Sequence, residues 1–399
     1  MTALSIWMRR CTAARAFPAL VAFALVVVYS RGGWQYEWGW GLERAGSAAG
    51  LLAVVAAGLA AHDRARLAHP TLTSLAAAAP RGQRGLLASA ASTWIVHVCA
   101  WLVAVLVVAV RVLGHAPGGA PDPLEPGAAP VALAAGTALG TMVGALLPNL
   151  AAGPVATIAT YLLALFGLGN GPDLFRPGDA VGTLIGLRPD PVLVIGAVVV
   201  HMALALASLS VAVAGTSVVT WPRAVAVVTA LVLVVAGVAQ DRQGDREAYV
   251  DAGWGTTCTG TSVVVCGPTD GGTVLRLTQR SLADAIDRLG PSGIAWQMRY
   301  RYEDGAVDPT GSGVVEVSPE TFVDERLSAD EIGLALGRPR MCAGFGDPGD
   351  EALLNDVSRV MDWVTHVLDA PVVPPAPAEV KAAYAALSTC PLATAGAQP

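Results

Sequence analysis

The chain has 399 residues, of which 54% are hydrophobic and only 14% are charged. Soluble proteins carry about a quarter charged residues, so this composition argues against a soluble protein and indicates a membrane protein. The charge is unevenly divided, with 13 basic and 8 acidic side chains up to Ala239 and 12 basic and 23 acidic side chains after it. Because the C-terminal part is acidic, we expect no nucleic-acid partner.

Apolar segments dominate the first 240 residues. A helix needs about 20 apolar residues to cross roughly 30 Å of hydrocarbon, and fewer where flanking Arg side chains reach the interface. We therefore predict an all-α polytopic membrane domain over residues 1–240 with seven transmembrane helices, or six if one weak segment is only interfacial. The predicted segments are 16–30, 45–61, 85–110, 131–147, 155–168, 191 to about 215, and 224–239.

The distribution of Arg predicts the orientation in the membrane. With the N-terminus inside, the cytoplasmic pieces carry eight Arg residues and one acid, whereas the outer loops, which include Arg44, carry five Arg residues and seven acids. Seven spans then place residues 241–399 outside the cytoplasm. We predict a multi-pass protein of the cell membrane with a cytoplasmic N-terminus and an extracytoplasmic C-terminal domain.

The C-terminal part, residues 241–399, has the pattern of a small α+β domain. One helix is expected from Ser281 to Gly290, a second after the capping-box residues Ser328 and Glu331, and the longest from about Asp350. Its predicted strands are 261–266, 273–278, 294–302 and 313–317.

Four cysteines lie in this domain: Cys258, Cys266, Cys342 and Cys390. An even set in an extracytoplasmic domain indicates disulfides, and four cysteines allow three pairings. We favour Cys258–Cys266, which closes a short loop, and Cys342–Cys390, which ties back the end of the chain. A zinc site is less favoured because His366 is the only histidine after residue 240.

Catalytic motifs are missing from the sequence. The single lysine, Lys381, has no glycine loop before it, so the chain has no P-loop, and there is no H-E-x-x-H or G-x-S-x-G pattern. We expect no catalytic residues, no cofactor and no metal, and ATP-driven work would need a separate ATP-binding chain. An unrecognised ectoenzyme remains a third alternative. His97 and His201, at membrane depth, are interpreted either as packing residues or as functional groups.

The fourth predicted span contains Gly136, Gly140 and Gly144, a doubled G-x-x-x-G pattern that allows another helix to approach closely. Two interpretations are open. The glycines either pack against a helix of the same chain or form the seam of a homo- or hetero-oligomer.

A basic loop follows the second predicted span. It carries Asp63, Arg64, Arg66, Arg81 and Arg84, with a helix-forming stretch at 72–79. On charge alone, such a loop is a topological anchor on the cytoplasmic side.

The layout of residues 1–215 resembles the membrane subunits of ABC-type exporters of the type-two permease class. This resemblance implies an amphipathic segment before the first span, matched here by Leu4–Arg10, and a coupling helix in the loop His62–Arg84 that docks on a separate ATPase subunit. The chain departs from this pattern by its seventh span and its C-terminal domain. We therefore expect a permease-like subunit, with a membrane sensor or accessory protein whose ectodomain binds a peptide or cell-envelope ligand as the alternative.

Overall fold

The computed structural model describes most of the two predicted regions. Its described residues are 8, 10–67, 82–115, 118–166, 184–214, 249–253, 255–302, 312–315, 322–323, 325–340, 342 and 351–392.

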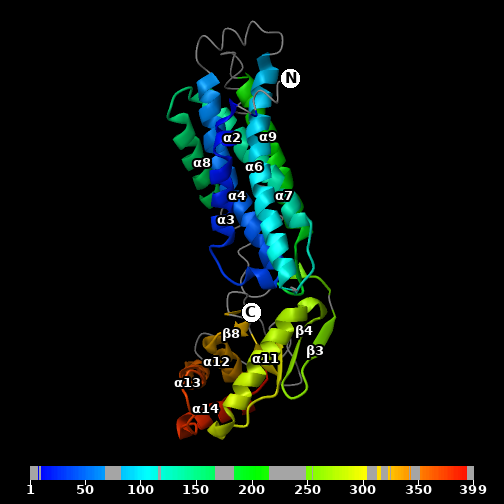
Figure 1. Cartoon of the computed structure of the whole chain (residues 1–399), viewed down its shortest axis with the longest axis vertical. Helices are drawn as coiled ribbons and strands as arrows, with labels where there is room; N and C mark the ends of the chain where they lie inside the picture. Colours follow the sequence, from blue (N-terminus) through cyan, green and yellow to red (C-terminus); the bar gives the residue numbers. More distant parts are fainter. Residues whose placement is uncertain are drawn as a thin grey trace.

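The N-terminal half is a bundle of helices that run along the long axis of the molecule (Figure 1). Its elements are α2 (Thr12–Arg15), α3 (Phe17–Val28), η1 (Trp34–Tyr36), α4 (Trp38–Leu67), α6 (Gly82–Gly114), α7 (Leu124–Leu146), α8 (Ala152–Phe166) and α9 (Pro191–Ala214).

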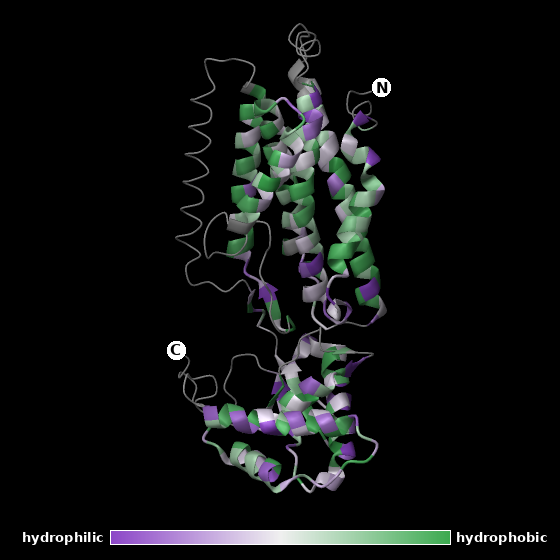
Figure 2. Ribbon diagram, turned by 90° about the vertical axis from the view of Figure 1, so that its left-hand side faces the viewer, coloured by the Kyte–Doolittle hydropathy of each residue, from purple (hydrophilic) through white to green (hydrophobic). Residues whose placement is uncertain are grey.

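Four helices in the described part of the chain are long and apolar enough to cross a membrane: α4, α6, α7 and α9. Two shorter apolar helices, α3 and α8, coincide with two further predicted spans. The prediction of seven spans is therefore not confirmed, and the last predicted span, 224–239, lies outside the described residues. The ribbons of the bundle are mostly hydrophobic (Figure 2), and large apolar side chains are exposed on α6 and α9. On α6 they are Leu102, Leu106, Val110 and Leu113, and on α9 they are Ile195, Val199, Met202 and Leu206.

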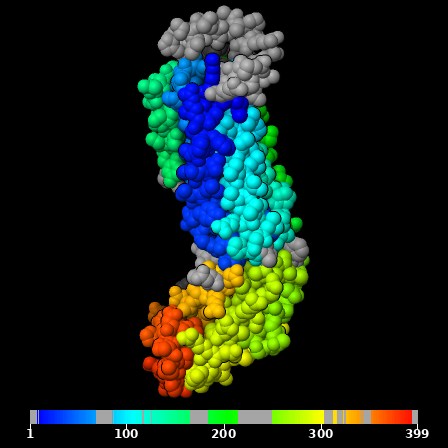
Figure 3. All heavy atoms as spheres, viewed as in Figure 1, coloured from blue at the N-terminus to red at the C-terminus, as the bar shows by residue number. Residues whose placement is uncertain are grey.

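Helix α4 lies at the centre of the bundle and packs against α3, α6, α7 and α8. Small residues allow this arrangement, because Ala53, Ala57 and Ala61 lie at four-residue intervals on one side of α4. Figure 3 shows α3 lying alongside α6 at the surface of the bundle.

The C-terminal domain is α+β, as predicted. Its helices are α11 (Gly272–Arg288), α12 (Ala329–Gly337), α13 (Glu351–Leu368) and α14 (Ala378–Thr389), with short 3-10 turns η2 (Thr269–Gly271) and η3 (Gly290–Ser292). A four-stranded sheet has the order β3 (Thr256–Thr259), β4 (Val264–Pro268), β5 (Arg299–Tyr302), β6 (Gly313–Val315). β3 and β4 are antiparallel, whereas β4, β5 and β6 are parallel, with α11 as the crossover from β4 to β5. A two-stranded ladder pairs β7 (Phe322–Val323) with β8 (Arg326–Leu327).

Two local predictions in this domain had different outcomes. The capping box is confirmed, because the Ser328 side chain accepts a hydrogen bond from the Glu331 amide at 3.3 Å. The predicted strand 273–278 is wrong, since these residues form the first half of α11. Its β-branched residues suggested a strand, but Val274, Thr278 and Ser281 continue one buried helical face, so packing overrides local propensity.

A second strand pair joins the two halves of the chain. β1 (Leu187–Pro189), just before α9, pairs with β2 (Tyr249–Asp251). We call the end of the bundle that contains β1 the junction end, and the opposite end, where α2 begins and α4 stops, the distal end (Figure 1). α9 ends with Ala214 at the distal end, and the next described residue, Tyr249, lies at the junction end.

Candidate functional site

At the distal end, a carboxylate of α4 holds the start of α2. Asp63 is buried and accepts a hydrogen bond from the Thr12 amide at 2.9 Å and a second, shorter one from the Thr12 hydroxyl. The residue before α2, Cys11, gives no side-chain cap. Asp63 therefore caps α2 from another helix, where a negative charge stabilises the first turn. This contact fixes the segment that precedes α3 to the end of α4.

The next residue, Arg64, is also buried, at 9% exposure. Its Nε atom has no hydrogen-bond partner among the described residues. The start of its side chain lies against α7, where a Cβ added at Gly144 would come within 2.9 Å of the Arg64 Cβ. Arg66, by contrast, is exposed.

The predicted coupling-loop residues are thus divided. Asp63 and Arg64 belong to α4 and are covered by neighbouring helices, so they do not present charge on a loop. Arg66, at the same end of α4, is exposed and could contact a partner. Residues 68–81, with Arg81 and the stretch 72–79, lie outside the described residues, as does most of Leu4–Arg10, and Arg84 is placed only as backbone in the first turn of α6.

The predicted glycine stripe packs within the chain. Methyl groups added at Gly136, Gly140 and Gly144 would overlap the backbone of Ala53, Ala57 and Ala61 of α4, respectively. A Cβ atom at any of these three positions would overlap a backbone carbonyl of α4, so only glycine fits there. The three glycines therefore set how closely α7 approaches α4. Of the two interpretations left open by the sequence, the structure supports contact within one subunit.

A charged layer in α4 was missed by the sequence analysis. The sequence analysis placed Glu43 and Arg44 in an outer loop, but both residues belong to α4 and are buried in the bundle. Arg44 Nε lies 2.5 Å from Glu43 Oε2, the Ser47 hydroxyl donates to Glu43 Oε1 at 2.9 Å, and the Arg44 guanidinium lies over the Trp40 ring. The four-residue spacings of Trp40 from Arg44 and of Glu43 from Ser47 were a signal for one continuous helix.

A buried carboxylate lies at the junction end of the bundle. Glu37, which precedes α4, is 1% exposed and accepts a hydrogen bond from the Leu184 amide at 2.9 Å. On the domain side, burial raises the pKa of Tyr302, the hydrogen bond with Thr278 lowers it, and the Glu37 carboxylate raises it further. Glu37 therefore influences the β5 residue Tyr302 from the bundle side of the junction.

Asp270 of η2 makes the second polar contact at this junction. Its backbone carbonyl accepts a hydrogen bond from the Gly119 amide at 2.8 Å, and its Oδ2 atom accepts one from the Gly186 amide at 3.4 Å. Oδ1 is buried without a partner in the described part of the chain. Burial raises the pKa of Asp270, and the amide bonds oppose this shift only in part.

Apolar side chains of the bundle half complete the core of the domain. Tyr36 and Ile185 belong to the same buried cluster as Leu282, Tyr300 and Val360, which lie in the domain's own elements. The Tyr36 ring lies 5.5 Å from the Phe322 ring, measured between centroids. The domain is therefore built onto the bundle.

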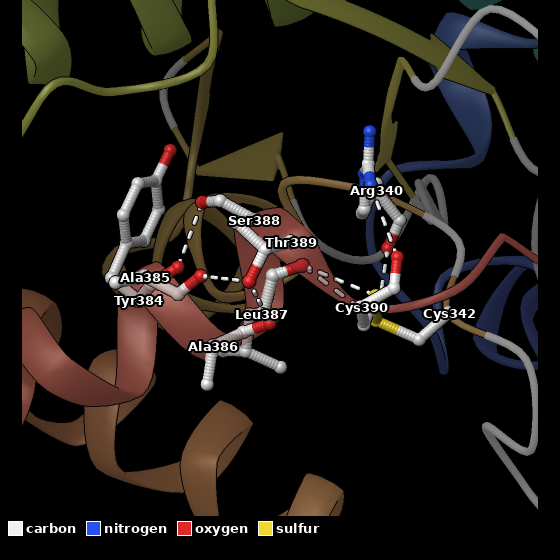
Figure 4. Close-up of a disulfide and its surroundings, with 9 residues drawn as sticks. All are labelled: Arg340, Cys342, Tyr384, Ala385, Ala386, Leu387, Ser388, Thr389 and Cys390. Atoms are coloured by element: carbon white, nitrogen blue, oxygen red, sulfur yellow. Dashed lines mark hydrogen bonds between the residues drawn. A yellow bond between two sulfur atoms is a disulfide. The ribbon is translucent and has the colours of Figure 1, made fainter.

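Both predicted disulfides are present. Cys258 and Cys266 are directly opposite each other on β3 and β4, with 4.0 Å between their Cα atoms. Cys342 and Cys390 are bridged with 5.6 Å between Cα atoms, and Arg340 donates to the Cys390 carbonyl beside them at 3.0 Å (Figure 4). This second bridge anchors the end of α14.

The two membrane-depth histidines are both buried. His97 donates through Nδ1 to the Thr93 carbonyl at 2.8 Å, which leaves Nε2 without a partner among the described residues. Within those residues, no group of three or more His, Cys, Asp or Glu side chains is placed to hold a metal ion. Comparison with known proteins returned no matching family model, no matching curated protein and no matching solved structure.

Proposed function

We propose that the protein is a permease-like membrane subunit of an ABC transport system, with ATP hydrolysis supplied by a separate chain. The observation that carries this proposal is the hydrogen-bonded contact between Thr12 and Asp63. It ties the helix before the first span to the last turns of α4, directly before the loop in which the resemblance expects the coupling helix. Movement of that loop by an ATPase would therefore reach α2, α3 and α4 together.

The proposed topology has a cytoplasmic N-terminus and an extracytoplasmic domain in the cell membrane. Ala214 and Tyr249 lie at opposite ends of the bundle, so the connection between them joins one end to the other. This supports an odd number of crossings before the domain. The two disulfides support the same orientation, since such bonds persist in oxidising compartments.

Co-purification of a P-loop ATPase from native membranes tests the coupling proposal. Arg66 is the exposed charge at the end of α4, so Arg66→Glu should reverse its attraction to an acidic surface and reduce ATPase recovery at least tenfold. The matched control is Arg15→Glu, which removes an exposed cation at the distal end in the last turn of α2. Equal ATPase recovery with wild type and both variants would refute docking through this segment.

A sensor or accessory role is the second candidate, and the shared core at the junction favours it. Because Tyr36 and Ile185 are part of the domain core, a ligand that reshapes the domain would act directly on the start of α4 and on the β1 segment. A soluble digest of cell-envelope peptides added to the purified protein is the test. A rise in the melting temperature without any ATPase present supports this role, and no change argues against it.

A further inference from the structure

Arg64 carries a buried positive charge that no hydrogen bond or ion pair within the described part of the chain neutralises. The residue is 9% exposed, the start of its side chain lies against α7, and Nε has no partner among the described residues. An unpaired buried ion is costly, so such a charge is normally matched by an opposite one. Arg64 therefore needs a negatively charged partner.

The sequence near the distal end offers almost no acid. Residues 1–16, 62–84 and 147–153 together contain seven Arg residues and one carboxylate, that of Asp63. Both oxygens of Asp63 accept hydrogen bonds from Thr12. This count covers every residue of the three segments, so a carboxylate from the loop 68–81 is excluded by sequence. No second carboxylate in these three segments can therefore neutralise Arg64.

The surroundings of Arg64 indicate the chemistry of a negatively charged partner. α7 ends at Leu146, two residues beyond Gly144. The residues that follow expose apolar side chains, with Leu150 83% exposed and Leu147 38% exposed. A buried arginine and exposed apolar side chains at the same end of membrane-length helices have the chemistry of a bilayer interface. Guanidinium binds phosphate through paired hydrogen bonds.

We propose that Arg64 binds the phosphate of an acidic phospholipid, with the acyl chains against the apolar surface at the end of α7. In the topology proposed above, this lipid belongs to the cytoplasmic leaflet. The site does not depend on an ATPase partner. It assigns Arg64 to the lipid, whereas Arg66 remains exposed for a protein partner.

Lipid titration of the purified full-length protein tests the site. Delipidated wild type in a neutral detergent is titrated with phosphatidylglycerol, with phosphatidylcholine and with inorganic phosphate, and both the melting temperature and bound lipid by native mass spectrometry are followed. We expect stabilisation by phosphatidylglycerol only, and Arg64→Gln should weaken its apparent affinity about tenfold. Arg64→Lys, which keeps the charge but loses the paired geometry, should fall between the two, and it replaces Arg64→Gln if that variant does not fold.

Arg15→Gln is the matched control, because it removes an exposed charge at the same end of the bundle. It should keep wild-type affinity for phosphatidylglycerol. An equal loss in the Arg15 and Arg64 variants would overturn the proposal in favour of diffuse attraction to the whole basic end. Equal stabilisation by inorganic phosphate would show a free-anion site, and unchanged binding in Arg64→Gln would exclude Arg64 as the ligand.

Discussion

The bundle and the soluble domain are stabilised in opposite ways. In the bundle, Gly140 of α7 lies against the Ala57 backbone of α4, and close approach is what holds the helices together. In the domain, large side chains such as Leu282 and Tyr300 fill a core that two disulfides then constrain. Added atoms should therefore destabilise the bundle most, whereas the loss of atoms or of disulfide bonds should destabilise the domain most.

The largest effect is expected from Gly140→Leu. The new side chain would meet the Ala57 carbonyl, which is backbone and cannot move aside, so overpacking should exceed the usual cost of about 1–3 kcal/mol and prevent assembly of the bundle. Gly127 lies on the same helix with no atom within 4 Å of an added Cβ. Size-exclusion profiles should show monodisperse Gly127→Leu protein and little or no monodisperse Gly140→Leu protein. Similar profiles for both would contradict the close approach of α7 to α4.

Loss of a disulfide is expected to be the next largest effect. The bond Cys342–Cys390 spans 48 residues and Cys258–Cys266 spans 8, so loop-closure entropy assigns them about 4 and about 2.5 kcal/mol, respectively. Cys342→Ser should therefore lower the melting temperature of the soluble domain more than Cys258→Ser does. The two melting temperatures can be compared by Trp fluorescence during thermal unfolding under non-oxidising conditions. A lower melting temperature for Cys258→Ser than for Cys342→Ser would show that the longer loop is already restrained in the unfolded chain.

A smaller effect is expected at the distal end. Thr12→Val removes one hydrogen bond to the Asp63 carboxylate and leaves the amide bond, which should cost about 1.5–3 kcal/mol. Thr157→Val is the control, because the Thr157 hydroxyl donates only to the Gly153 carbonyl one turn earlier in its own helix. The melting temperature in detergent should fall for Thr12→Val and hardly change for Thr157→Val. Equal values would mean that Asp63 does not fix α2.

The smallest effect is a pH dependence where the two regions meet. Because the folded-state pKa of Asp270 is raised, the folded protein binds this proton more tightly than the unfolded chain does. Its contribution to stability is complete below the ordinary pKa of about 3.9 and is lost as the pH rises through the folded-state value. Wild type should therefore lose stability relative to Asp270→Asn as the pH rises through this window. A constant difference in melting temperature from pH 3.5 to 7 would contradict the assignment.

Apart from the pairing Cys342–Cys390, the features that the sequence could predict are those encoded locally. The pairing Cys258–Cys266 follows from a short loop, the cap Ser328–Glu331 from a three-residue spacing, and the four long helices from apolar runs. Each of these depends on residues that are near one another in the chain, so no knowledge of the tertiary fold is needed.

What the sequence could not predict depends on contacts between distant residues. Asp63 accepts hydrogen bonds from Thr12, 51 residues away. Its role as a helix cap could therefore not be predicted from a loop whose charge indicated a topological anchor. Glu37 accepts a hydrogen bond from the amide of Leu184, 147 residues away, and β1 pairs with β2, which follows α9 in the chain. Charges at a helix end normally mark the edge of a span, and Glu43 and Arg44 break this rule because they pair inside α4.

The shared core at the junction has a consequence for the order in which the molecule is made. Tyr36 and Ile185 leave the ribosome well before the elements of the domain that pack on them, since the domain begins after residue 240. The early segments must therefore be inserted and folded before the late ones can close their core, and the bundle acts as a template on which the domain condenses. A domain synthesised without the bundle would expose the surface that these two side chains cover, and we expect it to bind chaperones or aggregate until that surface is supplied.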